Sequence, residues 1–179
     1  MRKLEVSELN RIDAEEYRKS MKLPVIVVLD NVRSLYNIGS VFRTSDAFRI
    51  EKIMLCGITA TPASSLVEIH KTALGAEQTV EWEYYEKTSD AVKKLKSIGF
   101  IPVAVEQVEN SNKLDEYRIP FSKYALIFGN EVKGVQQEVV DMCDMSLEIP
   151  QYGTKHSLNV SVSVGVVLWE FIRQLKGCI

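Results

Sequence analysis

The stretch PVIVVLDNVRSLYNIGSVFR, residues 24–43, decides the fold class of this chain. Residues 24–29 form a continuous apolar run, as in strands that are buried on both faces of a sheet. The polar residues Asp30–Arg33 follow, and apolar residues such as Ile38 and Phe42 then recur at helical spacing. The stretch therefore predicts a strand, a polar turn and a helix, which is the repeating unit of a parallel sheet covered by helices.

The same alternation continues along the chain. Short apolar runs predict strands at Pro24–Leu29, Lys52–Cys56, Thr79–Trp82, Phe100–Val105, Tyr124–Phe128 and Ser146–Ile149. Helical patterns predict helices at Val6–Met21, Asn37–Phe48, Leu66–Leu74, Thr88–Ser97, Val135–Met142 and Ser157–Lys176. We therefore expect one α/β domain over residues 1–179, with a mostly parallel sheet flanked by helices and a helical extension over residues 1–23.

Composition places the chain among ordinary globular proteins. It has 179 residues, of which 46% are hydrophobic, enough for a substantial core. We expect a cytoplasmic protein without membrane contact, because no apolar run approaches a membrane span and the start, MRKLEVSELNR, lacks the apolar stretch of a secretory signal. The three cysteines form no CxxC pair, and His70 has no evident ligand partner, so we expect buried cysteines and no metal site.

The charge balance argues mildly against a strong nucleic-acid binder. The formal net charge is −2, whereas such binders usually carry a basic excess or a basic stripe. Six basic residues lie between Arg2 and Lys22, but five acidic residues nearly balance them. This mixture is more typical of a solvated helix face than of a contact surface for nucleic acid.

The expected last helix is apolar on nearly every side over its first half. Such a helix is buried on several sides, either within the domain core or in a subunit interface. Gly165 in its middle would permit another helix to approach closely, at some cost in helix propensity.

Three polar clusters follow predicted strands, where ligand sites form in open α/β sheets. The first runs from Asp30 to Arg33 and continues over Asn37–Arg43. Arg43 stands beside the buried stripe of its helix, and taken alone it reads as a solvated charge. The second cluster is Gly129–Gly134, whose two glycines suit either backbone exposed to a ligand or a tight turn. It is not a P-loop, because Val135-Gln136 stands where that motif needs lysine and then serine or threonine.

The third cluster includes Pro150, Gly153 and His156–Ser161. Ser157 is a natural N-cap for the last helix. Asn159 is harder to explain structurally, because an amide in a nearly apolar helix needs hydrogen-bond partners. The chain has neither a GxSxG nucleophile elbow nor a GxGxxG dinucleotide fingerprint, which disfavours a serine hydrolase and a nicotinamide-dependent enzyme.

In this order the clusters resemble the three motifs of the SpoU/TrmH family of SPOUT RNA methyltransferases. They stand here as NIGSVFR (37–43), FGNEVKG (128–134) and IPQYGTKHSLNVSVSVG (149–165). KTALGA (71–76) also looks like a stretch that the family carries. Each motif is weak alone, but the three in order at strand ends are specific, and the resemblance covers roughly residues 24–175.

The resemblance implies a Rossmann-like fold in which residues from about 124 to 176 form a deep trefoil knot. Periodicity does not indicate a knot, and general rules of chain topology argue against one. The resemblance further implies a homodimer with each active site at the subunit interface, which suits the apolar final helix.

S-adenosylmethionine is the implied cofactor, held mainly by backbone groups. The residues that the motifs carry over as cofactor-binding are Val105, Glu106, Gly129, Glu131, Gly134, Ile149, Pro150, Leu158 and Asn159. No metal is implied.

The implied reaction is methyl transfer to a ribose 2′-hydroxyl of RNA, with Arg43 as catalytic residue and Asn37, Glu131, Ser157 and Asn159 orienting Arg43 and the substrate. We assign Arg43 to phosphate binding and charge stabilisation rather than to proton abstraction, because arginine stays protonated in proteins. The short extension favours tRNA slightly over rRNA. The alternatives are a knotted RNA-binding protein without catalysis and a nucleotide hydrolase built on Gly129–Gly134.

Overall fold

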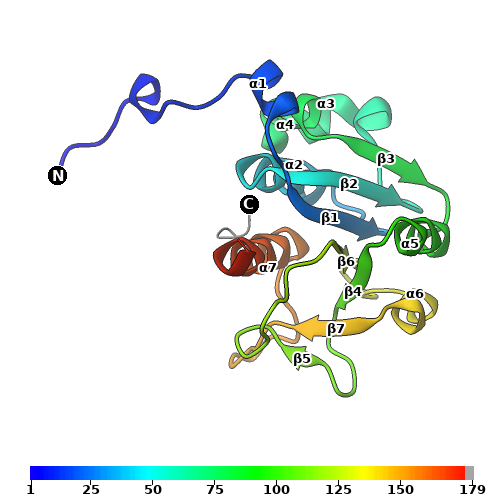
Figure 1. Cartoon of the computed structure of the whole chain (residues 1–179). Coiled ribbons are helices and arrows are strands. Elements are labelled where there is room, and N and C mark those ends of the chain that lie inside the picture. Colours follow the sequence, from blue (N-terminus) through cyan, green and yellow to red (C-terminus); the bar gives the residue numbers. More distant parts are fainter. Residues whose placement is uncertain (176–179) are drawn as a thin grey trace.

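A single parallel sheet organises the computed structural model, which describes residues 1–175 (Figure 1). Its seven strands lie in the order β3-β2-β1-β6-β4-β7-β5, and neighbouring strands pair in parallel throughout. The strands are β1 (Leu23–Asp30), β2 (Ile50–Cys56), β3 (Trp82–Tyr85), β4 (Ile101–Val105), β5 (Asn112–Lys113), β6 (Tyr124–Phe128) and β7 (Met145–Glu148). The predicted mostly parallel α/β sheet is confirmed.

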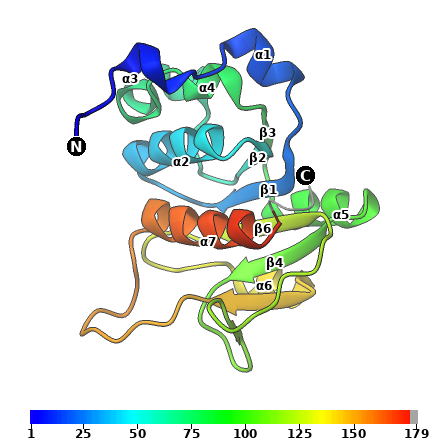
Figure 2. The same cartoon turned by 60° about the vertical axis from the view of Figure 1, so that its left-hand side comes forward.

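Helices cover both faces of the sheet (Figures 1 and 2). They are the 3-10 helix η1 (Val6–Leu9) and the α-helices α1 (Ala14–Lys19), α2 (Leu35–Ala47), α3 (Pro62–Ala73), α4 (Ala76–Thr79), α5 (Thr88–Ser97), α6 (Gln137–Met142) and α7 (Val160–Leu175). Alternate residues of β1 point to opposite faces. Val25, Val27 and Leu29 pack in one core with α2, α3 and α7, and Ile26 and Val28 pack in a second core with α5 and α6.

The first predicted helix and the third predicted strand differ most from the structure. The single helix expected over Val6–Met21 is wrong: η1 and α1 are separate, and Asn10 between them adopts a left-handed conformation, with φ 47°. The strand expected at Thr79–Trp82 begins at Trp82 instead, because Thr79 ends α4. Both windows mix polar with apolar residues, so local pattern alone did not fix the boundaries.

The last helix begins three residues later than expected. Asn159, not Ser157, is its N-cap: the Asn159 carbonyl accepts from the Ser163 N–H at 2.9 Å, and its Oδ1 accepts from the Ser161 N–H at 2.8 Å. The expectation that Asn159 lies inside the helix is therefore wrong, and capping satisfies its amide. The expected end at Lys176 lies outside the described residues.

Close helix packing occurs at Gly39 and not at Gly165. A Cβ on Gly39 would lie 2.1 Å from Thr72 Oγ1 and 2.3 Å from the Ile69 carbonyl oxygen, so α2 and α3 touch at this glycine. A Cβ on Gly165 would meet nothing within 4 Å. The expectation of a close approach at Gly165 is not met by the described part of this chain.

The segment between β4 and β6 contacts β7 and the C-terminal part of α7. The Leu114 N–H donates to the Glu148 carbonyl at 2.9 Å, and the Ile119 N–H donates to Gln174 Oε1 at 2.9 Å. Gln174 in α7 also donates from Nε2 to the Tyr117 carbonyl at 3.0 Å. Residues 106–123 thus connect to both β7 and α7.

The cysteines that the structure describes are packed away from solvent. Cys56 is buried, Cys143 is half-buried, and Cys178 lies outside the described residues. Burial raises the pKa of both described thiols to about 12, so both stay protonated at neutral pH. No helix within residues 1–175 has the length and hydropathy needed to cross a membrane.

Candidate active site

A large cavity lies where three adjacent parallel strands end. The C-terminal ends of β6, β4 and β7 border it, together with the loop before α7, and its volume is about 580 Å³. Ligand-binding cavities of proteins commonly measure roughly 300–1,000 Å³. Strand ends, size and converging loops make this cavity the candidate site, as expected for an open α/β sheet.

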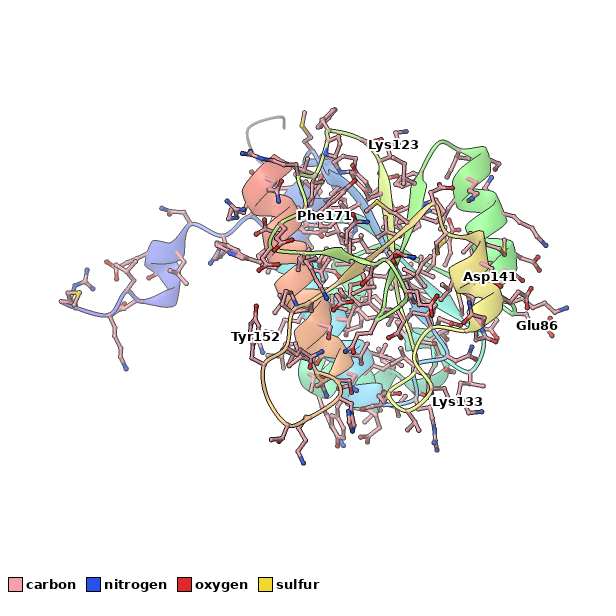
Figure 3. All side chains as sticks on the ribbon, turned by 90° about the horizontal axis from the view of Figure 1, so that it is seen from below. Glu86, Lys123, Lys133, Asp141, Tyr152 and Phe171 are labelled. Carbon is pink, nitrogen blue, oxygen red and sulfur yellow. The ribbon has the colours of Figure 1, made fainter. Side chains whose placement is uncertain are left out.

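The cavity lining combines apolar walls with acidic groups. Val105, Leu147, Ile149 and Leu158 supply apolar surface. Three glutamates lie in the lining, Glu106, Glu131 and Glu148. The lysine in the lining is Lys133, which lies on the loop after β6 (Figure 3). Such a lining suits a flat apolar group that also carries positive charge, and it opposes a polyphosphate.

Glu131 connects the loop after β6 to the start of α2. Its carboxylate accepts three hydrogen bonds of 3.0 Å, from the Arg33 N–H, the Ser34 N–H and Asn37 Nδ2. Ser34 is the N-cap of α2, so the carboxylate lies against the positive end of that helix. The second cluster is thereby fixed to the first.

The third cluster joins the same network through two amides. Asn159 Nδ2 donates to Asn37 Oδ1 at 3.1 Å, while Asn159 Oδ1 is held by the first turn of α7. A continuous chain of hydrogen bonds therefore runs from Glu131 through Asn37 to Asn159. Three candidate residues that lie up to 122 positions apart in the sequence are brought together.

The ionised form of Glu131 is favoured at this position. Burial alone would raise the pKa of its carboxyl, but hydrogen bonds from Arg33, Ser34 and Asn37 outweigh burial and lower the pKa. A lowered pKa in the folded state adds stability above the unfolded-state pKa of about 4.3, and this stability is lost as pH falls through the folded-state value.

We expect Glu131→Gln to lower the free energy of unfolding by about 1 kcal/mol at pH 7, because an amide offers only one acceptor oxygen to the three N–H donors that the carboxylate serves. Urea unfolding at pH 7 and pH 3.5 measures the difference from the wild type, which should shrink at the lower pH. Glu138→Gln, on the outer surface of α6, is the matched control and should be neutral. An equal loss at both pH values would contradict the role assigned to the ionised carboxylate.

Two glycines give the loop after β6 its shape. A Cβ on Gly129 would lie 2.0 Å from the Gly134 carbonyl carbon and 2.1 Å from the Val135 nitrogen. Gly134 has φ +67°, and a Cβ there would lie 2.2 Å from Glu106 Oε2. Glu106 in turn accepts from the Val135 N–H at 3.1 Å, which ties the end of β4 to this loop. The predicted site residues Glu106, Gly129 and Gly134 therefore form one packed unit.

Sequence reasoning missed Asn130 and Gln107. Asn130 Oδ1 accepts from the N–H groups of Val132 and Lys133, and its Nδ2 donates to the Asn31 carbonyl at 2.8 Å. An asparagine in a polar turn is a common sign of this arrangement. Gln107 Nε2 donates to the His156 carbonyl at 2.8 Å, and no local pattern indicates that contact.

A third residue, Asp30, belongs to the first cluster but was given no role, and it supports the loop from the side of α5 and α6. Its buried carboxylate accepts from Thr88 Oγ1 at 2.6 Å, from the Gln136 N–H at 2.8 Å and from Gln136 Nε2 at 2.7 Å. Because Gln136 precedes α6 directly, Asp30 fixes the point at which the loop enters that helix.

Most of the predicted site residues line the cavity, but some do not. Val105, Gly129, Gly134, Ile149, Leu158, Asn159 and Ser157 line the cavity together with both glutamates, whereas Pro150 is not among the lining residues. Arg43 is exposed, is not part of the cavity wall, and forms no hydrogen bond or ion pair within residues 1–175. It follows Asn37 by six residues, or about 9 Å along the helix axis. The structure therefore brings Asn37, Glu131 and Asn159 together and leaves Arg43 apart.

A search against protein families matches residues 24–169 to the model of the SpoU rRNA Methylase family. The chain belongs to this family. The matched range contains all three polar clusters, and the family resemblance inferred from the motifs is confirmed.

Relatives within the SpoU family modify different RNAs. The chain is 30% identical over 171 residues to the 23S rRNA (guanosine-2′-O-)-methyltransferase of Neisseria meningitidis, covering 92% of this chain and 65% of that one. It is 34% identical over 155 residues to the tRNA (guanosine(18)-2′-O)-methyltransferase of Aquifex aeolicus, covering 84% and 69%. A crystal structure of an rRNA methyltransferase from Sinorhizobium meliloti with bound AdoMet superposes with a TM-score of 0.78 at 27% identity, covering 89% and 60%. The chain thus spans about two thirds of the length of these relatives.

No group of three or more His, Cys, Asp or Glu side chains in the described part of the chain is arranged to hold a metal ion.

Proposed function

We propose that this protein transfers a methyl group from S-adenosylmethionine to the 2′-hydroxyl of a ribose in RNA. The observation that carries the proposal is the hydrogen-bonded chain Glu131–Asn37–Asn159 beside the cavity at the ends of β6, β4 and β7. It joins all three family motifs at one place. The relatives from Neisseria meningitidis and Aquifex aeolicus are named for 2′-O-methylation of guanosine, which supports the same reaction here.

S-adenosylmethionine fits the chemistry of this cavity. Its adenine ring has a flat face that can pack on apolar side chains, and its sulfonium centre is positive. The cavity wall provides both apolar side chains and more carboxylates than lysines. Backbone groups at Gly129, Ile149 and Leu158 would hold the nucleoside, with Glu106 and Glu131 close to its polar atoms. The related structure with bound AdoMet supports this choice of cofactor. When bound, S-adenosylmethionine supplies the activated methyl group.

The residues of the chain position the ribose and handle developing charge. The amide network holds Asn37 and Asn159 rigidly, which favours a fixed approach of the ribose. Arg43 stays protonated, so its guanidinium stabilises negative charge that develops on the 2′-oxygen and binds a neighbouring phosphate. Because the hydroxyl is absent from DNA, it also makes the reaction specific for RNA.

We propose a homodimer in which Arg43 serves the cavity of the second copy. Val162, Val166 and Trp169 form an apolar stripe along the exposed face of α7, where Trp169 is 59% exposed. Trp169 also lies against Phe48 just past α2, with ring centroids 6.2 Å apart, so the stripe continues toward the helix of Arg43. Arg43 lies outside the cavity wall of its own chain. If the stripe of one copy packs against a second copy, the Arg43 of the second copy would approach the cavity of the first.

We also propose that residues from about 124 to 176 form the deep trefoil knot that the family resemblance implies. The segment 106–123 would be the loop through which the chain passes. Its hydrogen bonds to β7 and to α7 support this path, because they place the segment across both elements.

We propose tRNA as the favoured substrate, although relatives include enzymes of both tRNA and rRNA. A net charge of −2 provides little general attraction to RNA, so binding depends on local basic groups and on the dimer surface.

Binding and transfer assays test this function. We expect calorimetry to detect S-adenosylmethionine binding, and radiolabelled methyl groups to enter RNA from cells that lack the gene. Nuclease digestion followed by mass spectrometry should recover 2′-O-methylnucleosides, with tRNA labelled more than rRNA. If the cofactor binds but no RNA is labelled, the alternative of a knotted RNA-binding protein without catalysis replaces the proposal. If the cofactor does not bind, the enzyme assignment fails.

A further inference from the structure

Residues 1–13, here called the N-terminal arm, project away from the body of the protein (Figures 1 and 3). Every arm residue whose burial is described is exposed to solvent. The hydrogen bonds recorded for residues 1–12 all stay within the arm. Apart from Asp13, which caps α1, the arm therefore forms no recorded hydrogen bond to the rest of the described chain.

The arm nevertheless has a defined internal structure. Arg2 donates two hydrogen bonds to the Glu8 carboxylate, at 2.9 and 2.7 Å, and the Glu5 N–H donates to Glu8 Oε2 at 2.7 Å. These contacts close the turn of η1. A preformed segment loses less conformational entropy when it binds than a disordered one would.

The root of the arm is fixed to the body through α1. Tyr17 is only 4% exposed and belongs to the core on the α2 and α7 face of the sheet. Arg18 Nη2 donates to the Gln78 carbonyl at the end of α4, at 3.3 Å. Packing therefore fixes α1, from which the arm extends.

The side chains of the arm suit a protein surface better than RNA. Leu4, Leu9 and Ile12 are 61%, 42% and 38% exposed, and they lie within one short segment. Clustered exposed apolar side chains mark contact with another protein surface. The basic residues Arg2, Lys3 and Arg11 are balanced by Glu5, Glu8 and Asp13, so the arm has little net attraction for phosphates.

The position of the arm identifies its partner. In Figures 1 and 3 the arm leaves the body on the side where α7 lies. Tyr152, 92% exposed, projects from the loop beside α7 on that same side (Figure 3). A second copy seated on the apolar stripe of α7 would therefore lie within reach of the arm.

We propose that the N-terminal arm packs through Leu4, Leu9 and Ile12 against a second copy of this chain and clasps the dimer. The inference rests on the dimer described under the proposed function. In a two-fold symmetric dimer each arm embraces the other subunit, so every arm contact occurs twice.

Sedimentation equilibrium on the full chain tests the clasp. The triple variant Leu4→Ser, Leu9→Ser, Ile12→Ser should raise the dimer dissociation constant roughly tenfold to hundredfold. Six apolar side chains per dimer that would be buried in the contact are replaced by small polar ones. Its S-adenosylmethionine affinity and far-ultraviolet circular dichroism should match the wild type, since the arm lies outside the core and the cavity. Val67→Ser, at a 73% exposed apolar side chain of α3, is the matched control and should leave the dissociation constant unchanged.

The outcomes separate the clasp from the dimer itself. A dimeric wild type whose dissociation constant is unchanged in the triple variant would overturn the clasp and leave the dimer standing. A monomeric wild type would overturn both. If the triple variant keeps the dimer but weakens RNA binding, the arm contacts RNA and the clasp is wrong.

Discussion

Arg43→Ala should reduce methyl transfer to RNA by roughly 10²- to 10³-fold, while the fold and the affinity for S-adenosylmethionine stay as in the wild type. This is the loss seen when one donor to a developing oxyanion is removed, equivalent to about 3–4 kcal/mol in the barrier. Arg43 is exposed and forms no hydrogen bond or ion pair within residues 1–175, so its removal should break nothing that holds the domain together. It also lies outside the cavity wall, which is why cofactor binding should not change.

Single-turnover transfer at saturating RNA measures the effect on the chemical step. Thermal unfolding and calorimetry with S-adenosylmethionine provide the matched controls for fold and cofactor site. Arg43→Lys should restore only part of the rate, because lysine keeps the charge but not the bidentate geometry of guanidinium. A wild-type rate in Arg43→Ala would remove this residue from the mechanism.

The central part of the fold could be predicted from local sequence because its strands are continuous apolar runs. The expected strand at Tyr124–Phe128 and the expected helix at Thr88–Ser97 coincide with β6 and α5. β6 lies between β1 and β4, and all five of its residues are buried, so pattern and burial agree. At the edge of the sheet, β5 has two exposed residues, and no apolar pattern marks it.

The candidate site could be predicted in its parts but not in its connections. The placement of Asn37, Glu131 and Asn159 at strand ends followed from order along the chain. Which residue caps α7 depended on the amide pair with Asn37, a contact across 122 positions that Ser157 does not make. A helix-cap rule weighs Ser157 and Asn159 nearly equally, so tertiary structure decided between them.

The packing of helices at glycines also could not be predicted from the sequence alone. Gly39 and Gly165 both stand within helices, and sequence alone drew attention to the second. The structure places Gly39 against Thr72 and the Ile69 carbonyl, whereas Gly165 faces open space in the described chain. Because helix propensity penalises both positions alike, only the packing partner distinguishes them.

Gly129→Ala should weaken S-adenosylmethionine binding by about 100-fold or more. The new Cβ would lie 2.0 Å from the Gly134 carbonyl carbon and 2.1 Å from the Val135 nitrogen, and neither backbone atom can swing aside as a side chain could. Relieving this steric clash requires breaking the two backbone hydrogen bonds between Asn130 and Gly134, of 2.9 and 3.0 Å, which close the loop. A displacement of this loop reshapes the cavity wall.

Calorimetry measures the affinity, and Gly165→Ala, whose Cβ meets nothing within 4 Å, is the steric control that should bind normally. Unchanged affinity in Gly129→Ala would place the cofactor elsewhere.

The Gly129→Ala variant also tests whether the site is shared between subunits, because it keeps Arg43 while Arg43→Ala keeps the cofactor loop. If Arg43 serves the second copy, an equal mixture of the two inactive variants, allowed to exchange subunits, forms one intact site in each mixed dimer. About a quarter of wild-type activity should then return, since half of the dimers are mixed and each has one of two sites restored. No recovery despite mixed dimers would mean that Arg43 acts within its own chain.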